Sequence, residues 1–200
     1  MNKIITIGRE FGSGGRELGR RLAEKLQIAY YDQEIITEIT KRTALSEEYI
    51  RNVEENQPLP LLPITVGRTF SLQFDSLVEQ HQTVFLQQSN IIKEMAVKSD
   101  CVIVGRCADY VLREFSPLRL FVYADITARI KRCRDKESAK RDWNDRELKR
   151  SILTVDKRRA KYYQFYTDQN WGEKKYYDLC INTGGLEIKT VVPAVAALIN

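Results

Sequence analysis

A cluster of glycines follows the first apolar run of the chain. The run Ile4-Ile-Thr-Ile7 precedes the cluster, and a helical pattern of apolar residues begins at Leu18 after it. A glycine-rich turn between a strand and a helix points backbone N–H groups and the positive end of the helix dipole at an anion. The sequence therefore predicts a phosphate-binding loop, formed by Gly12, Ser13, Gly14, Gly15, Arg16 and Glu17.

Two kinds of nucleotide-binding loop compete for this segment. The dinucleotide pattern G-x-G-x-x-G can begin at Gly12, with Asp32 about where a ribose-binding acid is found, but Glu17 occupies the third glycine position. The P-loop pattern G-x-x-x-x-G-K-[ST] can close at Gly14, but Gly15 stands in place of the lysine. The loop by itself leaves both interpretations open.

Further cationic groups are expected at the same site. Arg106 comes soon after the apolar run 101–104, and a guanidinium there can bind two phosphate oxygens at once. The alternative for Arg106 is a structural ion pair at the end of a strand. Asp156 and Arg159 are three residues apart, so they share one face of a helix and can act on one ligand.

Positive charge is concentrated in one block of the chain. Residues 129–161 contain 14 Lys and Arg against 6 Asp and Glu, a balance of +8, so the remainder of the chain carries −3 of the net charge of +5. Such a block suits a nucleic acid or a small polyphosphate ligand, and it also suits solvated helices with ion pairs between successive turns.

The elements that position these residues follow an alternating order. Apolar runs predict strands at 4–7, 28–31, 101–104, 118–123 and 179–181. Helical patterns predict helices at about 33–43, 47–55, 71–98, 107–114, 126–137, 144–168 and 188–199, besides the one after the glycine loop. Strands that are apolar on both faces and separated by helices indicate a parallel α/β sheet. Ligands bind beyond the carboxyl ends of such strands, so the loops after residues 7, 31, 104 and 123 should line one cleft.

The composition indicates one compact domain. The 200 residues are 43% hydrophobic and 30% charged, which excludes a disordered or fibrous chain. No apolar run is long enough to span a bilayer, and the N-terminus lacks the layout of a signal peptide. The four cysteines are isolated and accompanied by one histidine, which suggests neither a zinc site nor a disulfide framework. We therefore expect a reduced, cytoplasmic protein without a membrane partner.

Taken together, the segments resemble the cytidylate kinase-like branch of the P-loop nucleoside monophosphate kinases over nearly the whole chain. The resemblance rests on the order and spacing of several pieces. These are 9–18 for the phosphate loop, Tyr30-Tyr-Asp32, Val102-Ile-Val-Gly-Arg106, 121–124 leading into Arg129-Ile-Lys-Arg132, Asp156-Lys-Arg-Arg159, 159–163, Trp171-Gly172 and 177–183.

The resemblance implies a three-layer P-loop kinase fold, with a five-stranded parallel sheet between helices in one domain spanning 1–200. It implies a monophosphate-binding insertion at about 36–98 and a helical lid at about 129–161. The implied reaction is transfer of the γ-phosphoryl group of ATP, with Mg²⁺, to a pyrimidine nucleoside monophosphate such as CMP or dCMP. A small nucleotide is thus preferred to nucleic acid as the partner.

The resemblance also assigns roles to individual residues. The catalytic set would be Arg16, Arg106, Arg132, Asp156 and Arg159. ATP would be held by residues 12–17 together with Arg129, and Glu17 would be the metal ligand. The acceptor would be held by Asp32, Gln33, Arg106, Asp109 and Arg159.

Three positions depart from the family pattern. Gly15 replaces the P-loop lysine, Glu17 replaces the threonine that usually helps to hold Mg²⁺, and Cys107 replaces the acid of the family's Gly-Arg-Asp. Arg16 is the expected substitute for the lysine, and Asp109 is the candidate substitute for the lost acid. Three hypotheses stay open: an active pyrimidine monophosphate kinase, a degenerate member that binds a phosphorylated ligand without this reaction, and a nucleic-acid-binding module.

Overall fold

The computed structural model describes residues 2–43, 45–50, 71–137 and 144–199. Its centre is a five-stranded sheet in the order β2-β3-β1-β4-β5, and every neighbouring pair is parallel. The strands are β1 (Ile4–Arg9), β2 (Ala29–Tyr31), β3 (Cys101–Val104), β4 (Leu118–Tyr123) and β5 (Leu179–Asn182). The expected parallel sheet is confirmed, with all five strands close to their expected positions.

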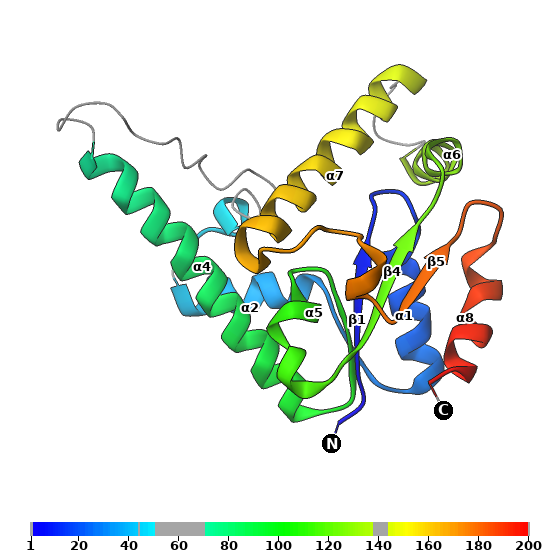
Figure 1. Cartoon of the computed structure of the whole chain (residues 1–200), viewed down its shortest axis with the longest axis horizontal. Coiled ribbons are helices and arrows are strands. Elements are labelled where there is room, and N and C mark those ends of the chain that lie inside the picture. Colours follow the sequence, from blue (N-terminus) through cyan, green and yellow to red (C-terminus); the bar gives the residue numbers. More distant parts are fainter. Residues whose placement is uncertain (1, 44, 51–70, 138–143, 200) are drawn as a thin grey trace.

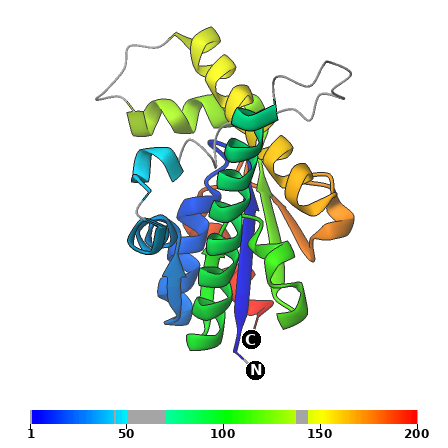
Figure 2. The same cartoon turned by 90° about the vertical axis from the view of Figure 1, so that its left-hand side faces the viewer.

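Helices cover both faces of the sheet. They are α1 (Gly15–Leu26), α2 (Gln33–Thr43), α4 (Ser71–Lys98), α5 (Ala108–Val111), α6 (Ile126–Glu137), α7 (Asp145–Thr167) and α8 (Ile188–Ala197), with 3-10 turns at Arg113–Phe115 and Lys174–Tyr176. In Figures 1 and 2, α4 lies on one side of the sheet, and α1 and α8 lie on the other. The three-layer arrangement is that of a P-loop kinase.

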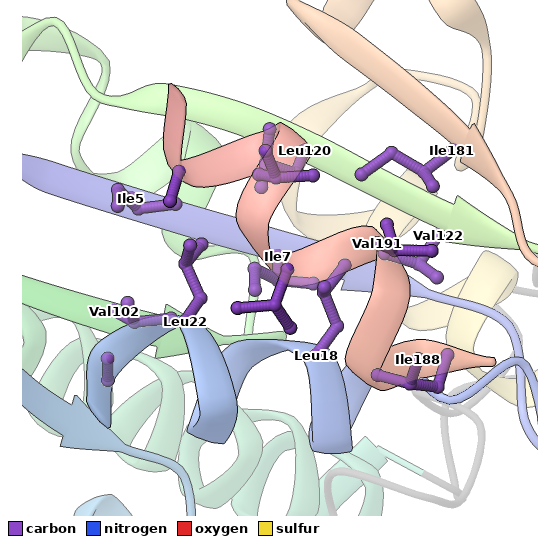
Figure 3. Close-up of a cluster of buried hydrophobic side chains, with 14 of the residues drawn as sticks. Ile5, Ile7, Leu18, Leu22, Val102, Leu120, Val122, Ile181, Ile188 and Val191 are labelled. Carbon is purple, nitrogen blue, oxygen red and sulfur yellow. The ribbon is translucent and has the colours of Figure 1, made fainter. Parts of the chain in front are cut away.

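The apolar character of the strands accounts for the two cores. Because side chains alternate along a strand, Ile5 and Ile7 of β1 face α1 and α8, while Ile4 faces α2 and α4. Figure 3 shows the first of these clusters, where Leu18 and Leu22 of α1 pack against the sheet. Because the buried strands are parallel, their carboxyl ends lie side by side at one edge of the sheet. The loops that follow them lie there too.

Helices α6 and α7 lie beyond the carboxyl ends of the strands, at the top of Figure 1. An Asn144 capping box starts α7: the Asn144 side chain accepts from the Glu147 N–H, and the Glu147 side chain accepts from the Asn144 N–H. The expected lid at 129–161 includes parts of both helices, and its residues 138–143 lie outside the described residues. The lid thus stays a prediction.

Two expected helices differ in extent or lie partly outside the described residues. The helix expected at 107–114 is only α5 followed by a 3-10 turn, because Cys107 lies in the left-handed region before α5 and the backbone leaves the helical region again at Leu112. The helix expected at 47–55 is present at 47–50, and 51–55 lie outside the described residues, as does 51–70 of the expected insertion. Within the described ranges, no helix is both long and apolar enough to cross a membrane.

Candidate functional site

The glycine loop joins the end of β1 to the start of α1. Gly12 and Gly14 have φ angles of 78° and 85°, which glycine adopts without the strain that a Cβ brings. No side chain caps α1 among the described residues, so its first N–H groups face the space before the helix. A Cβ on Gly14 would lie 2.5 Å from Cδ1 of Ile188, so the loop is also packed tightly against α8. The loop therefore has the backbone geometry expected of a phosphate cradle, and its binding of phosphate stays a prediction.

A network of charged groups holds this loop from the side of α6 and α7. Arg129 of α6 is buried; its Nε donates to the Phe11 carbonyl at 2.7 Å and its Nη1 to Glu10 at 3.0 Å. Its Nη2 pairs with Asp156 of α7, and the other oxygen of Asp156 accepts from the Phe11 N–H at 2.7 Å. Arg129 and Asp156 thus fix the backbone of the loop, and both side chains are engaged by protein atoms.

A second set of contacts holds the loop from the side of β5. Arg132 donates to the carbonyl of Gly12 at 2.9 Å and to that of Thr183 at 3.0 Å. The hydroxyl of Thr183 donates to the carbonyl of Ser13 at 2.6 Å, and the hydroxyl of Ser13 donates to the carbonyl of Glu10 at 2.9 Å. The loop is therefore preorganised by contacts from α6, α7 and the residue that follows β5.

The turn after β3 has an unusual backbone. Gly105, Arg106 and Cys107 have successive φ angles of 75°, 57° and 52°. A residue with a Cβ in this left-handed region costs about 1 kcal/mol or more, so Arg106 and Cys107 are held there by their surroundings. Strain of this kind concentrates at functional sites, where it aims a side chain.

A cavity of about 110 Å³ lies between the end of β1, the start of α1, this turn and α7. Its walls include five arginines: Arg9, Arg16, Arg106, Arg158 and Arg159. The remaining lining includes Gln33, Asp109, Cys107 and the aromatic residues Tyr162, Tyr163, Trp171 and Tyr177. The arginines give the cavity a strong preference for anions, since several positive charges share one partly buried space.

The negative groups nearby do not balance these arginines. Asp32 is buried and accepts from Arg16 Nε at 2.6 Å and from Arg106 Nη1 at 3.2 Å. Asp109 is also buried, and burial raises the pKa of its carboxyl, which accepts from the Tyr163 hydroxyl at 2.6 Å. A carboxyl whose charged form is disfavoured by burial offers less compensation to the arginines.

Arg9 is held in a position that disfavours its charge. Burial, together with the charge of Arg159, lowers the pKa of its guanidinium to about 9, although Asp32 partly opposes both. Arg159 lies close because its Nη1 donates to the carbonyl of Arg9 at 3.1 Å. A bound anion would relieve the repulsion between these neighbouring cations.

Comparison with known proteins agrees with this geometry. Residues 4–185 match the profile of the cytidylate kinase-like family. The chain belongs to the cytidylate kinase-like family. No curated protein matched the sequence.

The fold of this family member is similar to that of several solved structures. An uncharacterized protein from Eubacterium ventriosum shares 26% identity with a TM-score of 0.69, covering 99% of this chain and 98% of its own. Shikimate kinase from Bacteroides thetaiotaomicron shares 18% identity with a TM-score of 0.59, each chain 98% covered. Shikimate kinase from Acinetobacter baumannii, in complex with shikimate, shares 16% identity with a TM-score of 0.52, covering 100% and 93%. The family and the fold are both kinase-like.

The carboxylates of this cytidylate kinase-like chain do not form a Mg²⁺ site by themselves. The described residues contain no group of three or more His, Cys, Asp or Glu that could hold a metal ion. Glu17, the expected ligand, accepts from Arg21 Nε at 2.9 Å, and both oxygens of Asp32 are bound by guanidinium groups. Mg²⁺ needs free oxygen ligands, so the residues described do not fit it as a protein-held ion.

The structure sorts the expected site residues into two groups. Arg16, Gln33, Arg106, Asp109 and Arg159 come together around the cavity. Arg129, Arg132 and Asp156 instead hold the glycine loop, and Glu17 borders two shallower hollows to either side of α1. One of these hollows lies between α1, α6 and residues 184–189, and charged residues and two glycines are among its lining.

Several lining residues were missed by the sequence analysis. Arg9 was included only as part of the loop segment, and Arg158 only as part of the basic block. Tyr162 and Tyr163 of α7 are buried and also line the cavity. The alternation of side chains along β1 was the available signal for Arg9, because it places Arg9 on the same side as Ile5 and Ile7.

Proposed function

We propose that this chain transfers the γ-phosphoryl group of ATP to a pyrimidine nucleoside monophosphate, CMP or dCMP. The observation that carries the proposal is the group of five arginines around one cavity. Near it, the glycine loop leads into α1, whose first N–H groups have no side-chain cap among the described residues. Phosphoryl transfer depends on positioning and on charge stabilisation, and both are supplied by backbone N–H groups and guanidinium groups.

The roles divide between the two sides of the cavity. The loop at 12–17 would hold the phosphates of ATP, and Arg106, aimed by the strained turn after β3, would hold the phosphate of the acceptor. An oxygen of the acceptor phosphate attacks the γ-phosphorus as the bond to the β-phosphate oxygen breaks, and that oxygen leaves with the electron pair on ADP. Arg159 would lie beside the group in transit and reduce the repulsion between the two phosphates.

The state of the carboxyl groups favours a phosphate acceptor over a hydroxyl acceptor. A hydroxyl needs a general base, whereas a phosphate monoester has a second pKa of about 6 and is already ionised near neutral pH. Asp32 is bound through both oxygens to guanidinium groups, and Asp109 accepts a hydrogen bond from the Tyr163 hydroxyl at 2.6 Å. Neither group is arranged as a free base, which an ionised acceptor does not require.

The proposal is tested by ADP production from Mg-ATP with CMP, dCMP and UMP in turn. Saturable production that depends on CMP or dCMP supports it. Arg106→Ala should raise the KM for the acceptor, while Arg113→Ala, at the opposite end of the sheet where β4 begins, serves as the matched control. Absence of turnover with all three acceptors contradicts the proposal.

A second candidate function is nucleotide binding without this reaction. Gly15 in place of a lysine, and Glu17 paired with Arg21, favour it because two of the usual contacts to phosphate and metal are missing. Thermal-shift measurements against a panel of nucleotides distinguish the two. Stabilisation by nucleotides together with no turnover would favour the second candidate.

A further inference from the structure

Gly15 stands where a P-loop carries its lysine, and the backbone does not require glycine there. Gly15 is the first residue of α1, and it is not among the glycines with positive φ. A Cβ at this position would lie 2.5 Å from Cβ of Arg9 and 3.1 Å from its Cγ. Contacts of 2.5 Å between carbon atoms are not tolerated, so the side chain of Arg9 already occupies the space that a side chain at 15 would need.

The rest of the Arg9 side chain runs from Gly15 towards the turn after β3. A Cβ on Gly105 would overlap Nη1 of Arg9 and would lie 2.7 Å from its Cζ. The guanidinium therefore lies against Gly105, next to Arg106, while the stem lies beside the start of α1. This path places one positive charge between the glycine loop and the arginine expected to bind the acceptor.

The charged groups around the Arg9 guanidinium are mostly positive, which favours binding of an anion beside it. Its neighbours are Arg159 on α7, Arg106 after β3 and Arg16 on α1, with Asp32 after β2 as the opposing charge. Both oxygens of Asp32 are bound to Arg16 and Arg106. No ion pair with Arg9 is found within the described part of the chain, which leaves its fork of donors for a ligand in the cavity that it lines.

We propose that Arg9 supplies the positive charge that a P-loop lysine would supply, and that Gly15 is glycine to make room for it. This inference rests on the proposed function in that it takes the ligand to be a nucleotide polyphosphate. It replaces Arg16 in that role, because the Arg16 side chain is 60% exposed and its Nε is committed to Asp32 at 2.6 Å. The guanidinium reaches the phosphates from the end of β1 instead of from the first turn of α1.

The test exchanges the two positions. Binding of ATP and of inorganic tripolyphosphate is measured by calorimetry for the wild type, Arg9→Ala, and the double variant Arg9→Gly/Gly15→Lys. Loss of a charged hydrogen bond predicts binding about 10- to 100-fold weaker in Arg9→Ala. In the double variant, glycine at position 9 removes the Cβ that would lie 2.5 Å from the new one, so the lysine has room at this contact and should recover most of this loss. Arg113→Ala, which removes one positive charge at the other end of the sheet, should bind as the wild type does.

The outcomes separate this inference from the proposed function. Unchanged binding in Arg9→Ala overturns the inference, and so does a folded double variant that binds no better than Arg9→Ala. Polyphosphate binding that depends on Arg9, with no transfer to CMP, dCMP or UMP, supports the inference and contradicts the proposed function. A wild type that binds neither ATP nor tripolyphosphate contradicts both. Circular dichroism of each variant confirms that it is folded before its binding is compared.

Discussion

Two groups of arginines lie near the glycine loop, and they differ in how their charge is matched by carboxylates. Arg129, which with Arg132 forms the bracing arginines, pairs with both Glu10 and Asp156, and both arginines donate to carbonyl oxygens of the loop. The cavity arginines share one space in which Arg16 and Arg106 both pair with Asp32, and Arg9 has no ion pair within the described residues. The difference teaches that one group acts on the stability of the loop, while the other is arranged for an anion that the protein does not itself provide.

The bracing group predicts the largest change in stability. Arg129→Ala removes the partner of Asp156 and of Glu10 in a partly buried network, and leaves two carboxylates facing each other. Breaking one side of a buried ion pair lowers the free energy of unfolding by about 3–5 kcal/mol. Urea unfolding measures the change.

A matched control for that experiment is Arg134→Ala. Arg134 pairs with Asp145 between the same two helices, α6 and α7, but both side chains are more than half exposed. Exposed pairs contribute less than about 1 kcal/mol, so its unfolding curve should stay near that of the wild type. Equal losses in the two variants would mean that Arg129 does not brace the loop.

Gly15→Ala is expected to have the next largest effect. The new methyl would lie 2.5 Å from Cβ of Arg9 and 3.2 Å from Cβ of Val122, and overpacking of this kind costs about 1–3 kcal/mol. The cost should fall in an Arg9→Gly background, because the Cβ at 2.5 Å and the Cγ at 3.1 Å are both gone. A double-mutant cycle on the free energy of unfolding measures this coupling, and additive effects would refute the contact.

The cavity group predicts a change of opposite sign. Burial and the charge of Arg159 lower the pKa of Arg9, so at neutral pH the folded protein holds a charge that it disfavours. Arg9→Ala should therefore leave the free energy of unfolding unchanged or raise it by about 1 kcal/mol, even as phosphate binding weakens. A loss of more than about 1 kcal/mol would place Arg9 with the bracing arginines instead.

The fold was predictable because each strand is a short apolar run and each helix has a clear period. The same reasoning brought Arg16, Gln33 and Arg106 to one end of the sheet, since parallel strands share their carboxyl edge. The family resemblance added Asp109 and Arg159, which also line the cavity. That argument places the start of a side chain but not its far end. It could therefore not separate residues that reach the cavity from residues that reach the loop.

The bracing arginines show why the rest was out of reach. Arg129 and Asp156 are 27 positions apart, pair with each other, and both bind the backbone of Phe11. These contacts depend on how α6 and α7 pack against the loop. Arg9 could not be predicted for another reason. Arg16 is next to Gly15, the position of the missing lysine, so the sequence favours Arg16 as the substitute. Arg9, the cation that occupies the space of the missing lysine, comes six positions before Gly15 and packs directly against it. Only the folded structure shows this contact.

The smallest predicted effect concerns the acid of the cavity. Burial raises the pKa of Asp109, so its contribution to stability is present at low pH and is lost as the pH rises through the pKa of the folded state. Asp109→Asn keeps an acceptor for the Tyr163 hydroxyl and cannot ionise. Its stability relative to the wild type, measured as the difference in Tm, should therefore grow as the pH rises above the ordinary Asp pKa of about 4.

The exposed Glu173 is the control for this titration, because hydrogen bonds from Lys175 and Asn170 lower its pKa. Glu173→Gln should lose stability relative to the wild type as the pH rises, the opposite direction to Asp109→Asn. A Tm difference for Asp109→Asn that stays constant with pH would mean that the Asp109 carboxyl is ionised in the folded protein at no cost. Growth of that difference would instead show that the cavity holds its acid, like Arg9, at the expense of stability, as expected of groups placed for a ligand.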